Sequence, residues 1–165
     1  AHNGIGKVYT KMGLYDESIL HIKEALKLRP GNPVSLNNLG HNLLEKKAYA
    51  ETIKYYQKVL EEHKPSGNNL PLFSSMHSNK AAAHIHLKQK KQALKHLNKA
   101  IELNPKSPQA WHNKGAMYLM NAEFDRAIPL LKKSVELGPQ IQLHRDNLAL
   151  ALRLKKEAQE KKKER

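Results

Sequence analysis

Small residues recur at a fixed interval among the apolar positions of this chain. They stand at Gly6, Gly40, Ala81, Gly115 and Ala149, and the intervals between them are 34, 41, 34 and 34 residues. Around each of them, apolar residues follow the three-to-four-residue spacing of an amphipathic helix, and Gly, Pro and Asn separate the helical stretches. The pattern predicts one pair of helices in each interval.

The helix-breaking residues Gly, Pro and Asn predict where these helices begin and end. Helices over residues 1–12 and 16–28 form the first pair, which Gly13 divides and Pro30-Gly31-Asn32-Pro33 ends. The second pair turns near Lys47, and after Gly138-Pro139 a further helix starts near Ile141. We therefore expect four repeats, an insert between the second and the third, and a capping helix with a Lys-rich tail. The expected ranges are 1–32, 33–64, 74–107 and 108–140 for the repeats, 64–73 for the insert and 141–165 for the cap.

Two helices joined by a short turn can lie close together only where small residues face each other. We expect the small residues of the first helices to meet Ser18, Thr52, Ala93 and Ala127 on the second helices. In the capping helix, Ala149 is the expected small contact, and Leu148 and Leu152 are the expected apolar stripe. A single pair cannot cover its own apolar stripe, so neighbouring pairs must stack.

The stretch from Ser107 to Pro139 resembles the tetratricopeptide repeat family. It has Trp111, Lys114-Gly115, Tyr118, Ala127, Leu131 and Pro139 at the intervals of the family signature, with Lys114 as the one departure from the usual Leu. The resemblance implies an all-α, right-handed superhelical solenoid of four helix-turn-helix repeats plus a C-terminal capping helix. It also places Trp111, Tyr9, Tyr56 and Tyr118 at packing positions of the core.

Composition narrows the class of protein. The chain is 39% hydrophobic and 27% charged, which is ordinary for a soluble domain, and no run of eighteen apolar residues is present. There is no cysteine, so we expect no disulfides, although this leaves the compartment open. Because there is neither a secretory leader nor a membrane span, we expect a cytoplasmic protein. Because Ala1 begins inside a helix of the first repeat, we expect the sequence to be an excised piece of a longer protein, or one processed at its N-terminus.

The net charge of +14 is unevenly distributed. Residues 86–106 carry six Lys against one acid, and residues 151–165 carry seven Lys or Arg against three Glu. Such a balance can attract RNA, an anionic membrane or an acidic protein. The lysines lack interleaved aromatic residues, so a solvated outer face is the plainer interpretation.

An asparagine ladder is the most informative candidate site. Two residues before each of the last four small residues of the repeat pattern, which we call the small anchors, the chain has an asparagine. These are Asn38, Asn79, Asn113 and Asn147, on the first helix of successive repeats. A carboxamide offers a donor and an acceptor together, which suits it to the backbone of an extended peptide. In peptide-binding members of the resembled family, an asparagine at this position holds the ligand main chain. The alternative is that these residues cap or bridge neighbouring helices.

Further residues beside the ladder are candidates for specificity, namely Lys7, His41, His86 and His112. The set does not match the carboxylate clamp of co-chaperones that bind the tails of heat-shock chaperones. Asn3 and Lys7 occupy the clamp positions of the first repeat in reverse order, and Ser75 and Asn79 stand where the third repeat needs Lys and Arg. A chaperone C-terminus is therefore disfavoured as ligand.

The insert offers a second candidate contact. Residues 64–71 are rich in Pro, Gly and Asn and predict a solvent loop, and the alternative is a loop that folds over a partner through Leu70, Leu72 and Phe73.

Catalysis and metal binding are not indicated. His84 and His86 are two apart and point to different faces of a helix, and no phosphate-binding loop or nucleophile motif is present. We therefore expect no enzyme, no cofactor and no metal. The expected function is a non-catalytic scaffold or adaptor that binds a peptide segment of a partner protein in a concave groove. The alternatives are a basic module for RNA or anionic membrane, and self-association through stacked repeats.

Overall fold

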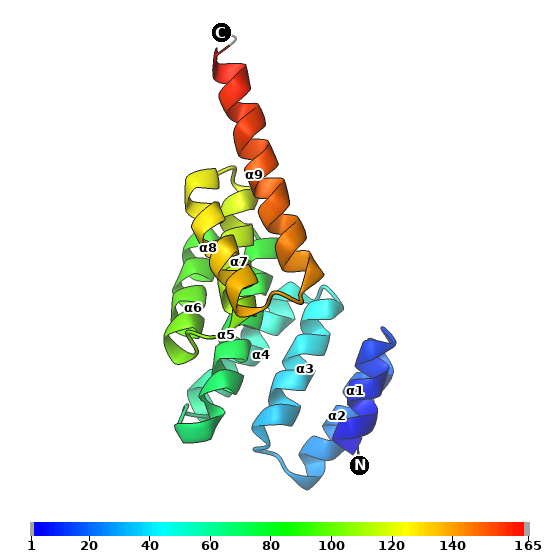
Figure 1. Cartoon of the computed structure of the whole chain (residues 1–165). Coiled ribbons are helices and arrows are strands. Elements are labelled where there is room, and N and C mark those ends of the chain that lie inside the picture. The colour runs from blue at the N-terminus through cyan, green and yellow to red at the C-terminus, as the bar shows by residue number, and fades with distance from the viewer. Residues whose placement is uncertain (1, 164–165) are drawn as a thin grey trace.

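The computed structural model describes residues 2–163, and nine α-helices with one short 3₁₀ helix occupy them (Figure 1). Helices α1 to α8 pack as four consecutive pairs, and α9 follows alone. The bounds are α1 His2–Lys11, α2 Tyr15–Leu28, α3 Pro33–Glu45, α4 Tyr49–Glu62, η1 Gly67–Asn69, α5 Leu70–His86, α6 Lys90–Leu103, α7 Pro108–Met120, α8 Phe124–Leu137 and α9 Gln142–Lys163. The prediction of an all-α solenoid with four helical pairs and a terminal helix is confirmed.

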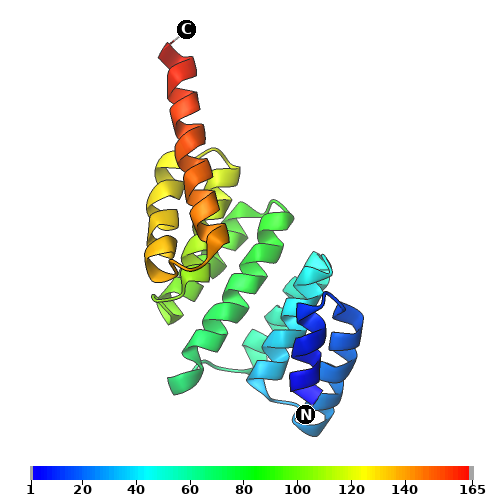
Figure 2. The ribbon, with the colours of Figure 1, turned by 45° about the vertical axis from the view of Figure 1, so that its right-hand side comes forward.

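The helices form an inner and an outer layer. Odd-numbered helices contact the next odd-numbered helix along the whole stack, whereas no two even-numbered helices contact each other within residues 2–163. Helices α1, α3, α5, α7 and α9 therefore line the inner side of the curved stack, and the even-numbered helices lie outside (Figures 1 and 2). This arrangement turns one face of every first helix toward a shared groove.

Local sequence sets where the inner helices start. The side chain of Asn32 accepts a hydrogen bond from the backbone N–H of Ser35 at 2.9 Å, and Pro33 occupies the first turn of α3. Ser107 accepts from the N–H of Ala110 at 3.3 Å in front of α7. Proline is tolerated at these positions because the first helical N–H groups have no partner inside the helix.

The small anchors allow the two helices of a pair to pack closely. A Cβ added to Gly6 would lie 2.8 Å from Ile22, one added to Gly115 would lie 2.7 Å from Leu131, and one added to Gly40 would overlap the ring of Tyr56. The predicted small partners on the second helices are all buried, but the glycines contact the large residue that follows each partner by four. The expected contact between small residues is present in the first pair, where the hydroxyl of Ser18 donates to the carbonyl of Gly6 at 2.7 Å, and in the third, where Ala81 and Ala93 share one core cluster. In the three pairs with a glycine anchor, a large residue fills the remaining space beside it.

Each turn inside a pair has one residue in the left-handed backbone conformation. These are Gly13 with φ 76°, Lys47 with φ 61°, Lys88 with φ 58° and Ala122 with φ 56°, at the same intervals as the small anchors. A side chain costs free energy in this conformation, and glycine does not have that cost. Only the first of the four turns has glycine, the residue that this conformation favours.

Replacing Ala122 by Gly should therefore raise the free energy of unfolding by about 0.5–1 kcal/mol, because it removes the left-handed strain. The matched control is Ala149→Gly at an exposed position inside α9, where the same change should lower stability by about 0.5–1 kcal/mol. Urea denaturation of the two variants measures both signs. Destabilisation by both substitutions would contradict the assignment of the turn.

The insert is more ordered than its composition suggests. Residues 67–69 form the 3₁₀ helix, and α5 begins at Leu70, so Leu70, Leu72 and Phe73 are helical. Phe73 is fully buried with Tyr56 and Met76, and Leu72 packs against the same cluster. The alternative of a loop that folds over a partner through these three residues is wrong, because all three belong to α5, and the core takes the apolar surface of Leu72 and Phe73.

The capping helix docks in a different way from that predicted. His144 and Ala151 are buried and Leu148 packs beside α8, but Ala149 is exposed and Leu152 is 46% exposed. In the four pairs, the small position faces the second helix of its own pair, and α9 has no such helix within the described residues. The expectation that Ala149 and Leu152 lie in the apolar contact is therefore wrong.

The predicted aromatic core residues are buried to different degrees. Tyr56 is fully buried, Tyr118 packs at the edges of two core clusters, and Tyr9 is partly exposed. Trp111 is also partly exposed, and its indole N–H donates to the carbonyl of Pro105 at 2.8 Å. The ring lies at the rim of the core because its N–H needs this polar partner.

Candidate functional site

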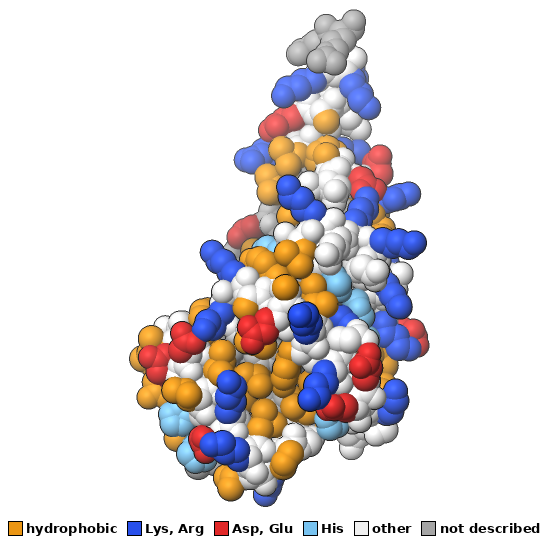
Figure 3. Space-filling view, turned by 180° about the vertical axis from the view of Figure 1, so that it is seen from behind, with side chains coloured by type: hydrophobic (Ala, Val, Ile, Leu, Met, Phe, Trp, Pro, Cys, Tyr) orange, Lys and Arg blue, Asp and Glu red, His pale blue; other side chains and the backbone are white. Residues whose placement is uncertain are grey.

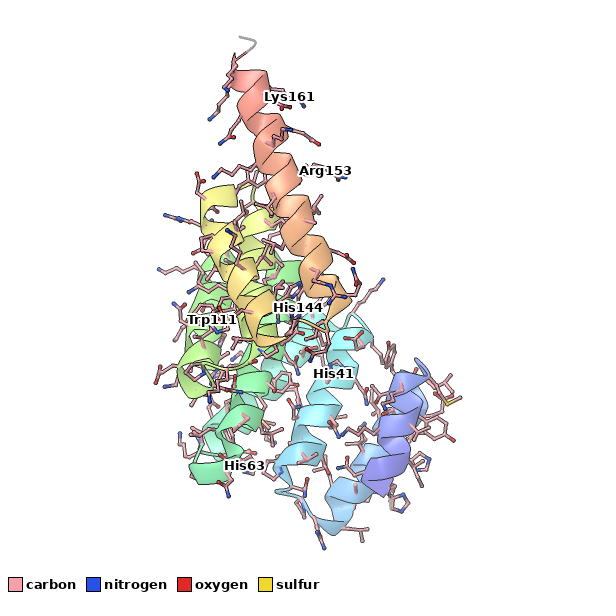
Figure 4. The ribbon with its side chains drawn as sticks, in the orientation of Figure 1. His41, His63, Trp111, His144, Arg153 and Lys161 are labelled. Carbon is pink, nitrogen blue, oxygen red and sulfur yellow. The ribbon has the colours of Figure 1, made fainter. Side chains whose placement is uncertain are left out.

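A cleft of about 560 Å³ opens on the inner side of the solenoid. Helices α3, α5, α7 and α9 and the start of α4 form its walls, so residues more than 90 positions apart in the sequence share one surface. Figure 4 marks His41 on α3 and His144 on α9, the helices that bound the cleft at its two ends. The lining residues include His41, Glu45, Lys47, Tyr49, Asn79, His86, Gln109, His112, Asn113 and Leu143.

Five of the eight candidate residues lie together in this cleft. They are His41, Asn79, His86, His112 and Asn113. The other three do not line it: Lys7 is exposed on α1, Asn38 donates to the side chain of Asn3 at 3.1 Å, and Asn147 contacts the ring of His112. The structure thus brings together the middle of the predicted ladder and leaves its two ends outside.

The two central asparagines present opposite halves of their amides to the cleft. The NH2 group of Asn79 donates to the hydroxyl of Tyr56 at 3.0 Å, and no protein group within residues 2–163 bonds its carbonyl oxygen. Asn113 is the reverse, since its carbonyl oxygen accepts from Gln109 at 2.6 Å, and its NH2 group has no partner among those residues. One residue can accept from a ligand and the other can donate to it.

Hydrogen bonds between repeats fix the tautomer of one cleft histidine. The NH2 group of Asn147 donates to Nε2 of His112 at 2.8 Å, so Nδ1 of that ring carries the proton and can point to Asn113 Oδ1 at 3.4 Å. The ring stacks on His144 with 4.3 Å between ring centroids. Burial lowers the pKa of His112 to about 4 and also lowers the pKa of His144. His112 is therefore a neutral groove residue at physiological pH.

The rest of the cleft surface is polar with balanced charge. The rings of Tyr49 and His86 stack nearly parallel with centroids 4.4 Å apart, and sequence reasoning missed this pair because the two residues lie on different repeats. His41 lies 3.9 Å from the carboxylate of Glu45, and Lys47 lies nearby at the rim. One fixed negative charge and one fixed positive charge thus face the cleft.

A second group of histidines lies between α5 and α6, away from the cleft. Nδ1 of His77 and Nδ1 of His96 are 3.0 Å apart, and His84 stacks on His96 with 5.5 Å between centroids. Burial lowers the pKa of His77 to about 4 and that of His96 to about 3, and the nearby Lys80 adds to both effects. In the sequence, His77 and His84 stand out only as departures at positions where large apolar or aromatic residues are expected, and nothing there indicates that they stack with His96. No group of three His, Asp or Glu side chains in the described chain could hold a metal ion.

Several of the basic residues are paired with acidic ones. Lys90 pairs with Glu123, Lys99 pairs with Glu102 at 2.5 Å, and Lys155 pairs with Asp125 at 2.7 Å. On the face in Figure 3, basic side chains are scattered and acidic side chains lie among them. Of the helices in residues 2–163, none is long and apolar enough to cross a membrane.

Family models described as tetratricopeptide repeat match most of the chain. One model matches residues 1–32 and 34–62, a second matches 74–107 and a third matches 96–128. The third match is offset by one helix, which fits a continuous stack in which every helix packs on the next.

The chain is also similar to longer proteins. It is 25% identical over 103 residues to an Hsp70-Hsp90 organizing protein of Triticum aestivum, covering 62% of this chain and 16% of the relative. It is 24% identical over 141 residues to the tetratricopeptide repeat-containing protein trd-1 of Caenorhabditis elegans, covering 84% of this chain and 17% of the relative. The chain thus spans about a sixth of the length of these relatives.

Solved structures share the fold at low sequence identity. The crystal structure of TTC0263, a thermophilic TPR protein of Thermus thermophilus, superposes with a TM-score of 0.78 at 20% identity, covering 91% of this chain and 79% of that one. A chain of the APC/C hetero-tetramer Cut9-Hcn1 superposes with a TM-score of 0.77 at 22% identity, covering 92% of this chain and 29% of that one.

Proposed function

This chain belongs to the tetratricopeptide repeat family, and we propose that it is a non-catalytic scaffold that binds an extended peptide segment of a partner protein in its inner cleft. The observation that carries the proposal is the pair of amides on α5 and α7. Asn79 offers a carbonyl oxygen and Asn113 offers an NH2 group to the same cleft. A peptide backbone needs both an acceptor for its N–H and a donor for its C=O.

The size of the cleft supports an extended ligand. Three inner helices at about 8–10 Å separation span about 20 Å, which is the length of about six residues of extended chain at ~3.3 Å each. The cleft has one fixed negative and one fixed positive charge, which offset each other. Main-chain hydrogen bonds and contacts with Tyr49, His86 and Leu143 therefore carry most of the recognition.

The chemistry of the cleft points away from a carboxylate-terminated ligand. Some relatives are named Hsp70-Hsp90 organizing proteins, but the clamp positions of this chain have Asn3, Lys7, Ser75 and Asn79 instead of the required set. Asn3 bonds Asn38, and Lys7 lies outside the cleft. The ligand we propose is therefore an internal segment of a partner rather than a charged C-terminal tail.

A peptide selected from a random display library against this protein tests the proposal. Replacing Asn79 and Asn113 by Ala should raise the Kd of the selected peptide about tenfold or more, because two backbone contacts are lost. Isothermal titration calorimetry measures the Kd of both proteins. Unchanged affinity in the double variant would contradict the proposal.

Two controls separate binding from folding. Asn98→Ala changes an exposed asparagine on the outer helix α6 and should leave the Kd unchanged. Because Asn79 also bonds Tyr56 between repeats, the single variant Asn113→Ala, which breaks no bond between repeats, should show weaker binding at unchanged thermal stability.

A further inference from the structure

The last helix has one buried face and one open face. Its residues follow those of α7 at an interval of 34, so His144 and Ala151 correspond to Ala110 and Met117, which pack toward the preceding pair. All four of these residues are at most 2% exposed. The face of α9 that contacts α8 thus repeats the face by which α7 contacts α6.

The opposite face of α9 has no partner within residues 2–163. In α7, the corresponding face packs on α8 through Gly115, Tyr118 and Leu119. The equivalent residues of α9 are Ala149, Leu152 and Arg153, and all of them are exposed. Around Ala149 they leave a shallow slot of about 350 Å³, lined by Asp146, Ala149, Leu150 and Arg153.

The slot is built for one large side chain. In every complete pair, the second helix supplies one large, fully buried residue that lies sixteen positions after the small residue of the first helix. These large residues are Ile22, Tyr56, Leu97 and Leu131. Glycine contacts the large residue directly in three of the pairs. Ala149 stands in the place of the glycine, so its slot lacks the large residue of a second helix.

The adjoining segment of the chain does not supply that helix. The turn that follows α7 is at Ala122, and the equivalent position in α9 is Lys156. The helix passes this position without a turn and continues to Lys163, about 10 Å further at 1.5 Å per residue. Figures 1 and 2 show that this end of α9 extends beyond α7 and α8, away from the slot.

The charges around the slot select the kind of helix that can fill it. Arg145 and Arg153 stand one turn before and one turn after Ala149 on the same face, and Figure 4 marks Arg153 on the exposed side of α9. In α7, these two positions hold Trp111 and Leu119. Arg153 lies 3.7 Å from Glu157, but α9 as a whole carries seven Lys or Arg against three Asp or Glu. Arg145 also donates to the carbonyl of Pro139 and to the side chain of Gln142, and the carboxylate of Asp146 lines the slot. The two arginines outnumber this one acid, so a partner helix with carboxylates near both arginines complements the charge around the slot.

We propose that the open face of α9 binds an amphipathic, acidic helix of a partner protein, which inserts a large apolar side chain against Ala149 and places carboxylates near Arg145 and Arg153. The partner helix takes the place of the second helix of a fifth pair. A second copy of this chain is disfavoured as the occupant, because two molecules with a net charge of +14 repel each other. The site is separate from the cleft that we propose for peptides.

A synthetic acidic helix tests this site. The probe is an Ala-rich, fluorescein-labelled helical peptide of about 18 residues, with a central Leu and Glu four residues to either side of it. Fluorescence anisotropy at about 0.15 M salt measures its Kd. The double variant Arg145→Glu/Arg153→Glu should raise the Kd about tenfold or more, because attraction becomes repulsion at both ends of the slot.

Three controls make the result decisive. Lys54→Glu/Lys58→Glu makes the same change in net charge on the exposed surface of α4 and should leave the Kd within about twofold. Asn79→Ala/Asn113→Ala alters the peptide cleft and the bond from Asn79 to Tyr56, none of which involves the open face of α9, and should also leave the Kd unchanged. Circular dichroism melts verify that each variant folds.

Several results would overturn the proposal. Equal losses in the two charge-reversal variants would show unspecific attraction to a basic protein. Equal binding of a peptide with the Leu and Glu positions scrambled, or no binding by the unaltered protein, would show that the slot does not accept a helix. A dimer in analytical ultracentrifugation that Arg145→Glu/Arg153→Glu dissociates would identify a second copy as the occupant.

Discussion

Replacing Tyr56 by Ala should lower the free energy of unfolding by about 3–5 kcal/mol, in the range measured for large aromatic residues in protein cores. The ring is fully buried, fills the space left by Gly40 and packs with Phe73 and Met76 of the next repeat. The substitution therefore opens a cavity both within the second pair and between the second and third pairs. Urea denaturation followed by circular dichroism measures the change.

Tyr56→Phe is the matched control for the hydroxyl group. That group donates to the carbonyl of Asn37 at 3.0 Å and accepts from the NH2 group of Asn79 at 3.0 Å. Losing these hydrogen bonds while keeping the ring should cost about 1–2 kcal/mol. If the two variants lose the same free energy, the hydrogen bonds rather than the packing of the ring would join the repeats, against our account.

Acidification from pH 7 to pH 4.5 should lower the free energy of unfolding by about 3 kcal/mol through three histidines that are buried or half-buried. In the unfolded chain, imidazoles take up protons near pH 6.5, whereas burial lowers the pKa of His77, His96 and His112 to about 4, 3 and 4 in the folded protein. The unfolded state thus binds more protons below pH 6.5, and protonation favours it. The contribution to stability is complete above pH 6.5 and falls as the pH drops toward 4.

The expected size takes account of the partial exposure of His77 and His96. We expect about 1 kcal/mol for each histidine, which is less than the pKa shifts alone would give, because solvent screens the charges. Hydrogen bonding adds a geometric reason, since Nδ1 of His77 and Nδ1 of His96 are 3.0 Å apart, and only one of the two atoms can carry the proton that they share. Protonating both atoms places two N–H groups face to face.

Urea denaturation at several pH values measures this effect. His96→Phe keeps an aromatic ring in the stack and should reduce the loss of stability between pH 7 and pH 4.5 by about 1 kcal/mol. His63→Gln lies outside the stacked groups and should leave the loss unchanged. A loss that begins only below pH 4.5 would point to carboxylates instead and would contradict the role of the histidines.

The interval between small residues predicted the helical pairs because close packing imposes it. Gly6, Gly40 and Gly115 are small for a reason that acts within each pair, so their spacing repeats with the structure. The same spacing misplaced Ala149, because the small residue is needed only where a second helix is present. The pattern records local contacts and does not show where the stack ends.

Features that join different repeats could not be predicted from the spacing. The stack of Tyr49 on His86 and that of His112 on His144 each bring together residues from different pairs, and their contact depends on the curvature of the solenoid. The burial of Phe73 depends on how α5 packs against its neighbours after the insert, which the spacing does not specify. The asparagine ladder was predicted as four equivalent residues, and curvature places only Asn79 and Asn113 in the cleft.

Two separate surfaces follow from this architecture. The inner cleft offers amides of opposite hydrogen-bonding character to an extended chain, and the open face of α9 offers a slot between two arginines to a helix. A chain with both could hold two partners at once, in keeping with the scaffold function we propose.

Nuclear magnetic resonance of the ¹⁵N-labelled protein with a library-selected peptide tests the central claim most directly. The side-chain NH2 signals of Asn79 and Asn113 should shift on titration, while those of Asn98 and Asn68, on the outer surface, should stay in place. Backbone shifts should follow α3, α5 and α7. Shifts confined to the lysines of α6 and the end of α9, with the two asparagines unmoved, would contradict binding in the cleft and would favour a basic surface that attracts acidic ligands.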